Sequence, residues 1–220
     1  MRTPVLFVVI ALVHLAGEAF VHPLVNYTKP LLMPALALWW WTNSKGDPMR
    51  LFILAALLFS CLGDVLLMWS GVYAHYFLLG LSAFLVAHLF YIYVFRRLSR
   101  GETGLLTQKP WMVFPFMIFL FQLLALLWPN IPVAMKGAVT VYGLVISTMA
   151  ASALHLRGIL PRSAANWLLL GAVLFVLSDS MIAIHKFGFP FPESRVAIMS
   201  TYIIGQFAIV RGLLMRESRV

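Results

Sequence analysis

The stretch LLFSCLGDVLLMW, residues 57–69, decides how this chain folds. It is apolar except for Ser60, Gly63 and Asp64, and it continues an apolar run that begins near residue 50. About 20 such residues in an α-helix cross the ~30 Å hydrocarbon layer of a bilayer. The stretch therefore predicts a membrane-spanning helix that carries one carboxyl group inside the membrane.

The composition extends this prediction to the whole chain. Of the 220 residues, 62% are hydrophobic and 10% are charged, and the mean hydropathy is +0.94. No polar stretch is long enough for a separate soluble domain. We predict an all-α fold, a polytopic membrane helix bundle that forms a single integral membrane domain over residues 1–220. Eight apolar segments are the expected transmembrane helices: residues 4–21, 30–42, 50–69, 74–95, 111–128, 132–154, 165–185 and 196–214.

The basic residues predict the orientation of these helices. Twelve of the 16 lysine and arginine residues fall on the side of the N-terminus, and four fall on the other side. Because basic loops stay in the cytoplasm, we expect a multi-pass protein of the inner or plasma membrane with both termini cytoplasmic. The net charge of +9 then reflects topology and contact with anionic membrane lipids, and it does not predict nucleic-acid binding.

Two acids interrupt the expected helices. Asp64 lies thirteen residues beyond Leu51, and Asp179 lies thirteen beyond Asn166. At about 1.5 Å per residue each rise is about 20 Å, so both carboxyl groups are expected at one depth, in the half of the membrane away from the cytoplasm. An ionised acid there costs about 2.5–3.5 kcal/mol, which marks these residues as candidates for function. The alternative is structural: a protonated or lysine-paired aspartate that ties helices together.

A small residue precedes each acid. Gly63 comes before Asp64 in LGDVLL, and Ser178 comes before Asp179 in LSDSMI. Small residues permit close approach of neighbouring helices. The shared pattern suggests that the two four-helix halves are a diverged parallel repeat.

Lys29 opens the second apolar segment, in KPLLMP at residues 29–34. We expect the two prolines of this motif to mark a helix start and a bend. Lys29 and the helix N-terminus then form a site for a phosphate, and the alternative is an interfacial lysine. His88 and Tyr91 are three residues apart and share a helix face. They line a cavity in one interpretation and are hydrogen-bonded interior residues in the other.

Three further polar residues are expected to face the bundle interior: Tyr142, Tyr202 and Gln206. For Gln206 the alternative is an amide that only bridges helices. The six histidines are scattered with no i, i+4 pair, which argues against a histidine zinc site, and no metal is predicted. The alternative that the sequence leaves open is a set of His75, His88 and His185 from different segments. The chain also lacks the HExxH, CxxC, GxSxG and Walker motifs.

Six short motifs together resemble the YhhN-like lysoplasmalogenase family. They occur in the order of that family over nearly the whole chain: KPLLMP at 29–34, SCLGDVLLM at 60–68, GLSAFLVAHLFY at 80–91, VYG at 141–143, LFVLSDS at 174–180 and YIIGQ at 202–206.

The resemblance implies an eight-span hydrolase that cleaves the vinyl ether bond of lysoplasmalogens. The products would be a fatty aldehyde and glycerophosphocholine or glycerophosphoethanolamine. It also implies that Asp64 and Asp179 are essential and that Lys29, His88, Tyr142, Tyr202 and Gln206 line the pocket. No cofactor, metal or protein partner is implied.

The residues themselves suit this chemistry. Vinyl ether hydrolysis begins when an acid protonates the carbon β to oxygen, and two close carboxyl groups do not both ionise readily, so one can be acid and the other base. A proton-coupled transporter of lipids or small molecules is the main alternative, because matched acids and broken helices also suit transport. A non-catalytic lipid-binding or assembly protein is a third interpretation.

Overall fold

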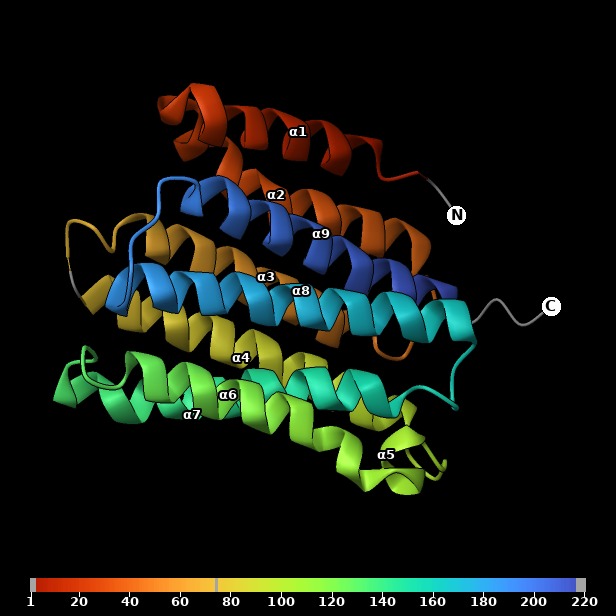
Figure 1. The fold of residues 1–220 in the computed structure, drawn as a ribbon. Helices are drawn as coiled ribbons and strands as arrows, with labels where there is room; N and C mark the ends of the chain where they lie inside the picture. The colour runs from red at the N-terminus through yellow and green to blue at the C-terminus, as the bar shows by residue number, and fades with distance from the viewer. Residues whose placement is uncertain (1–2, 74, 217–220) are drawn as a thin grey trace. The chain divides into compact units, whose positions relative to one another are not determined.

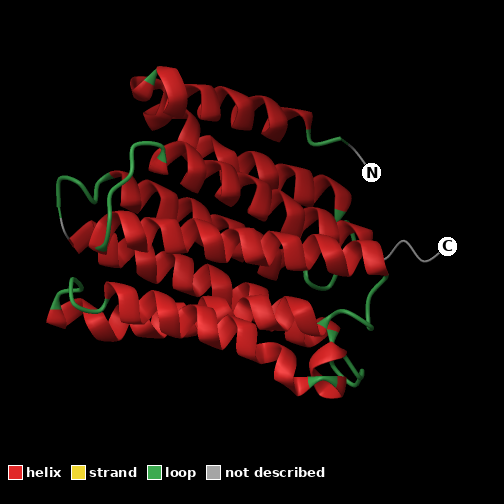
Figure 2. Cartoon of the chain, viewed as in Figure 1, coloured by secondary structure: helices red, strands yellow, loops and turns green. Residues whose placement is uncertain are grey.

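The structure is a computed structural model, and it describes residues 3–73 and 75–216. In these residues the regular structure is entirely helical, which confirms the predicted fold class (Figures 1 and 2). The chain forms two compact units that divide between Val94 and Phe95. That they act as one domain stays a prediction.

Four helices build the first unit. They are α1 (Val5–Phe20), α2 (His22–Asn43), α3 (Arg50–Met68) and α4 (His75–Leu98), the last of which continues a few residues past the boundary. A single residue, Val21, separates α1 from α2, and the two helices pack along each other. α2 also packs on α3. Phe52 and Phe59 of α3 meet Phe90 of α4, which joins these two helices through aromatic rings.

The second unit contains a short connection and four long helices. The connection holds α5 (Leu105–Gln108) and the 3₁₀ helix η1 (Pro110–Val113), and the helices are α6 (Phe114–Leu127), α7 (Val133–His155), α8 (Arg162–Phe187) and α9 (Ser194–Met215). Pro132 and Pro161 come directly before α7 and α8, where a fixed φ favours helix initiation. The boundary thus leaves four long helices in each described unit, whereas a repeat between the halves stays a prediction.

Within the described residues, six helices are long and apolar enough to cross a membrane. α1 is apolar but has only 16 residues. α2 has 22 residues but is not among the six, since its sequence includes Asn26, Lys29 and Asn43. Every predicted segment corresponds to a helix, and the chain is a multi-pass membrane protein. The six helices that are long and apolar enough to cross a membrane are Arg50–Met68, His75–Leu98, Pro110–Leu127, Val133–His155, Arg162–Phe187 and Ser194–Met215.

The start of the second helix differs from the prediction. Pro30 was expected at the helix start, but α2 begins at His22, with Pro23 in its first turn and Pro30 and Pro34 inside it. Proline at the first helical positions costs no hydrogen bond, which explains the observed start. Lys29 therefore lies in the interior of α2, and the predicted phosphate site at a helix N-terminus is wrong.

Glycines set how closely α8 and α9 approach. A Cβ added to Gly171 on α8 would lie 2.6 Å from the carbonyl oxygen of Gly205 on α9. A Cβ on Gly205 would lie 3.0 Å from the carbonyl oxygen of Gly171. The two backbones thus meet directly, which is how small residues join helices in membranes (Figure 1). This contact places α8, the helix of Asp179, firmly on α9.

Candidate functional site

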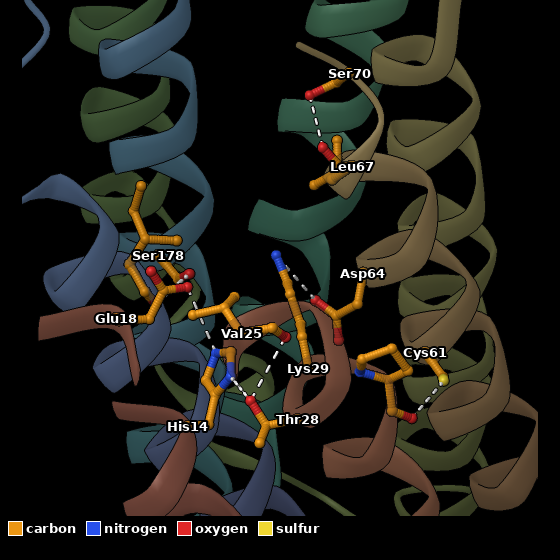
Figure 3. Close-up of polar contacts among 12 residues, drawn as sticks. His14, Glu18, Val25, Thr28, Lys29, Cys61, Asp64, Leu67, Ser70 and Ser178 are labelled. Carbon is orange, nitrogen blue, oxygen red and sulfur yellow. Dashed lines mark hydrogen bonds and ion pairs between the residues drawn. The ribbon is translucent and has the colours of Figure 1, made fainter. Parts of the chain in front are cut away.

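Asp64 of the first unit is buried beside a lysine. It lies on α3, four residues before the helix ends at Met68, and only 3% of its surface is exposed. The Nζ atom of Lys29 on α2 is 4.0 Å from its Oδ1 atom (Figure 3). A carboxylate in an apolar environment is tolerated mainly when a cation accompanies it. The ion pair therefore favours an ionised Asp64 and also joins α2 to α3.

The helix that carries Lys29 is weakened at this level by its own prolines. Pro34 has no N–H, so it cannot donate to the carbonyl group of Pro30 one turn earlier. The thiol of Cys61 on α3 occupies that position, with its Sγ atom 3.5 Å from the Pro30 oxygen (Figure 3). Cys61 thus supplies a weak donor to this carbonyl group. α3 thereby supports α2 next to Lys29.

A buried polar cluster supports α2 from its other neighbour, α1. His14 on α1 is completely buried, and its Nδ1 atom is 2.8 Å from Oγ1 of Thr28 on α2. The Thr28 hydroxyl donates to the carbonyl oxygen of Leu24 at 3.0 Å, so we assign the donor role in the first contact to His14 Nδ1–H. His14 Nε2 faces the Oε1 atom of Glu18 at 3.6 Å (Figure 3). The residue that His14 holds, Thr28, directly precedes Lys29.

The sequence analysis missed this cluster, although a signal was present. His14 and Glu18 are four residues apart and therefore share a helix face. Spacings between histidines do not reveal this pair. A histidine and an acid at i, i+4 inside an apolar segment are the signal that predicts it.

Close packing of α3 on α4 confirms the role predicted for Gly63. A Cβ at this position would lie 2.5 Å from the ring of Phe84 on α4. His88 and Tyr91, one and two turns further along α4, are both completely buried. They are interior residues of the helix packing, and their contact with a substrate stays a prediction.

Asp179 of the second unit is held by a tyrosine. It lies on α8, and the hydroxyl of Tyr142 on α7 donates a short hydrogen bond to its Oδ2 atom. Asp179 is half-buried, whereas Tyr142 is 7% exposed. Two residues predicted separately as site residues are thus brought together by α7 and α8. Their separation of 37 positions offers no spacing signal for the pair.

The pair opens into a narrow apolar crevice of about 50 Å³ between α6, α7 and α8. Its walls are mainly aliphatic and aromatic side chains, including Leu120, Leu124 and Val176. Asp179 and Tyr142 lie among its few polar groups. The crevice therefore presents a carboxyl group to a small apolar space, whose volume is well below that of pockets that hold whole ligands.

The predicted residues on α9 are buried near this helix pair. Tyr202 is 3% exposed, and its ring packs edge-on against Phe175 of α8 at 5.4 Å between centroids. Gln206 is completely buried. Ser178, next to Asp179, donates to the Ile198 carbonyl oxygen of α9 at 3.0 Å, so this small residue does join helices as predicted. Substrate contact by Tyr202 or Gln206 stays a prediction.

No three His, Cys, Asp or Glu side chains converge on a metal site anywhere in residues 3–73 and 75–216. Each aspartate instead has a partner from the neighbouring helix in its own unit, Lys29 for Asp64 and Tyr142 for Asp179. That the two carboxyl groups act on one substrate stays a prediction, which rests on the common membrane depth expected for them from the sequence.

Comparison with known proteins decides the family. The family model described as "YhhN family" matches residues 24–213. The chain belongs to the YhhN family. The predicted resemblance is thus confirmed, and the matched range includes Lys29, Asp64 and Asp179 but not His14 or Glu18. No solved structure matches the chain.

Several proteins named lysoplasmalogenase are similar to most of the chain. Lysoplasmalogenase TMEM86A of Bos taurus is 35% identical over 192 residues, which are 80% of this chain and 73% of the relative. The human TMEM86A protein, also named lysoplasmalogenase, is 34% identical over 80% of this chain and 73% of its own length. A lysoplasmalogenase of Mycobacterium bovis is 31% identical over 90% of this chain and 72% of the relative.

Proposed function

We propose that this chain is a lysoplasmalogenase, an intramembrane hydrolase of the vinyl ether bond of lysoplasmalogens. The proposal rests on relatives of that name and on the placement of Asp179 and its tyrosine in an apolar crevice. The products are a fatty aldehyde and glycerophosphocholine or glycerophosphoethanolamine. The crevice is too small for the long chain of a lipid, so we infer that α6 moves aside when the substrate binds.

The reaction consumes one water molecule and needs a proton donor and a proton acceptor. The acid protonates the alkene carbon β to the ether oxygen, and the resulting oxocarbenium ion takes up water at its cationic carbon. The hemiacetal then breaks its bond to the glycerol oxygen, which leaves as the hydroxyl of the second product. The two protons of water end on the aldehyde chain and the glycerol oxygen, so the step balances without an oxidant or reductant.

The different partners of the two acids suggest a division of roles. Asp64 is 4.0 Å from an ammonium group, which favours its ionised form and suits a base that activates water. Asp179 instead has a neutral hydroxyl partner and lines the apolar crevice, where the alkene of the substrate would meet it. We assign the proton donor to Asp179 and the acceptor to Asp64. Tyr142 orients the donor, and Lys29 positions the acceptor.

Aldehyde release by purified protein tests the proposed activity. In detergent, where no compartments exist, the protein should convert a lysoplasmenylethanolamine to an aldehyde, whereas a transporter should leave the lipid intact. In heavy water, one deuterium should appear on the carbon next to the aldehyde carbonyl. A lysolipid with a saturated ether should inhibit without being cleaved, and an ester lysolipid should react slowly because no nucleophile with its base is predicted. Rapid ester cleavage, or an aldehyde without that deuterium, would contradict the two-aspartate scheme.

The orientation belongs to the same proposal. We infer from the distribution of basic residues that both termini face the cytoplasm. Reporter fusions after Arg100 and after the C-terminus should therefore report a cytoplasmic location, and a tag between Phe187 and Glu193 should not. A cytoplasmic tag in the latter loop would contradict the predicted topology.

A further inference from the structure

A cavity of about 500 Å³ lies in the second unit, between the end of α4, α5, η1, α6 and α7. Its volume is in the range of pockets that hold small molecules and lipid head groups. Ser147 lines both this cavity and the crevice of Asp179, but the two aspartates and Tyr142 do not line the cavity. The proposed hydrolysis leaves this space without a role.

The cavity has one polar and one apolar wall. Along α7 the polar wall includes Ser147, Thr148, Ser152 and His155, at positions that share one helix face. Arg96 adds a guanidinium group from the last turn of α4. The opposite wall is formed largely by the apolar side chains of η1 and α6, such as Val113, Phe116 and Met117. A ligand that matches both walls is amphiphilic.

Backbone contacts with the end of α7 hold the α5 segment that lines the cavity. The backbone N–H of Leu105 in α5 donates to the Arg157 carbonyl oxygen at 3.0 Å. Gly104 lies so close to α7 that an added Cβ would be 2.2 Å from the His155 carbonyl oxygen. The connection between α4 and α6 is thus anchored on the end of α7, and its residues Leu106 and Val113 line the cavity.

The cavity opens to the outer surface of the helices, where several of its lining residues are exposed. Among the lining residues, Met117 and Leu144 are 46% and 44% exposed, and Arg96 and Thr148 are exposed as well. On helices that cross a membrane, exposed Met and Leu side chains contact lipid chains, whereas an arginine at a helix end lies at the level of the head groups. The opening therefore offers apolar contact along α6 and α7 and the guanidinium group of Arg96 at the end of α4.

Positive charge continues beyond the cavity. A second hollow of about 530 Å³ is lined by Arg157 and Arg162 together with Leu105 of α5. Arginines in the last turn of α4 also compensate the helix dipole, but Arg96 and Arg97 serve that purpose equally. Of these two neighbours, Arg96 lines the cavity and Arg97 does not. The dipole therefore does not explain why Arg96 meets a wall of hydroxyl groups.

We propose that this cavity binds one anionic glycerophospholipid from the surrounding bilayer. The phosphate is bound by Arg96 with donors from the Ser147 and Ser152 hydroxyl groups of α7 and from His155, and the acyl chains lie against Phe116 and Met117 of α6. Arginine suits this role because its planar group donates two parallel hydrogen bonds to phosphate. The proposal does not depend on the hydrolase activity, since the lipid is a ligand here and is not cleaved.

Native mass spectrometry of the full-length protein in detergent tests this site. With phosphatidylglycerol we expect one lipid to remain bound when further lipids have dissociated, and phosphatidylcholine to be retained less. Arg96→Gln should weaken that retention by about tenfold or more, because a charge-assisted phosphate contact is lost. The matched control Arg97→Gln removes the same charge from the same turn and should retain the lipid as the unmodified protein does.

A blocking variant separates the cavity from the surface charge. Thr148→Trp fills the opening from an exposed position and should abolish retention, whereas Leu170→Trp, on the exposed face of α8, should not. Both should keep the melting temperature of the unmodified protein. Equal loss in Arg96→Gln and Arg97→Gln would show general surface attraction and overturn the proposal. Displacement of the lipid by inorganic phosphate alone, or unchanged retention in Thr148→Trp, would overturn it too.

Discussion

Asp64 and Asp179 occupy different surroundings in their respective units. Asp64 is almost completely buried and has a cationic partner, Lys29, on a helix that contains two internal prolines. Asp179 is half-buried, has a neutral hydroxyl partner, and lines an apolar crevice. Two acids that look alike in the sequence thus have different partners. The comparison teaches that the partner, rather than the motif, distinguishes their surroundings, and the proposed assignment of acid and base rests on that difference.

The largest effect should come from removing either carboxyl group. Asp64→Asn and Asp179→Asn keep the shape of the side chain but cannot exchange the proton, so we expect turnover to fall by about 10²–10⁴-fold. Aldehyde release by purified variants is the measurement, with the melting temperature in detergent as the control for folding. If either variant keeps more than about a tenth of the activity, a barrier change under ~1.4 kcal/mol, that residue is not the essential acid or base.

The next effect concerns the cation. Lys29→Met leaves Asp64 buried without its ammonium partner, so we expect about 10–100-fold slower turnover and a lower melting temperature. Lys29→Arg retains the charge and should recover part of both. In the double variant Lys29→Met/Asp64→Asn the melting temperature should rise again, because no unpaired charge is left. Additive losses in the double variant would show that the two side chains do not interact.

A smaller effect is expected at the neutral partner. Tyr142→Phe removes the hydroxyl that orients Asp179 and should slow turnover about tenfold, mainly in kcat, since one hydrogen bond to the acid is lost. Tyr93→Phe, at an exposed position on α4, is the matched control and should be unchanged. A loss in Tyr142→Phe as large as in Asp179→Asn would mean that the tyrosine itself transfers the proton.

The smallest effect should come from the supports of α2. His14→Phe and Cys61→Ala each remove one contact beside Lys29, and each should lower turnover by less than about tenfold, since a hydrogen bond contributes about 1 kcal/mol. His14→Gln keeps a donor and should recover activity relative to His14→Phe. Unchanged turnover together with a lower melting temperature would show that these contacts stabilise the fold without positioning Lys29.

The sequence was sufficient to locate the helices but not to show which side chains of different helices contact each other. Apart from the start of α2, hydropathy located every long helix within a few residues, because a membrane span requires a long apolar segment. The start of α2 was missed because proline alone does not show whether a neighbouring helix compensates the lost hydrogen bond, as Cys61 does at Pro30. Both aspartates were visible as charges in apolar runs. Tyr142 could not be matched to Asp179 from spacing, because their contact depends on how α7 packs on α8.

The glycine contact between α8 and α9 has a mechanical consequence. Where Gly171 and Gly205 meet, no side chain lies between the backbones, so neither helix can slide or roll past the other without a steric clash. α8 and α9 should therefore move as one rigid body, and Asp179 with them. In contrast, α6 belongs to the span Pro110–Leu127, in which only 11% of the residues are buried, so few neighbours hold it. We expect α6 to be the part that yields when a lipid enters beside Asp179, so the acid keeps its orientation while the wall of the crevice opens.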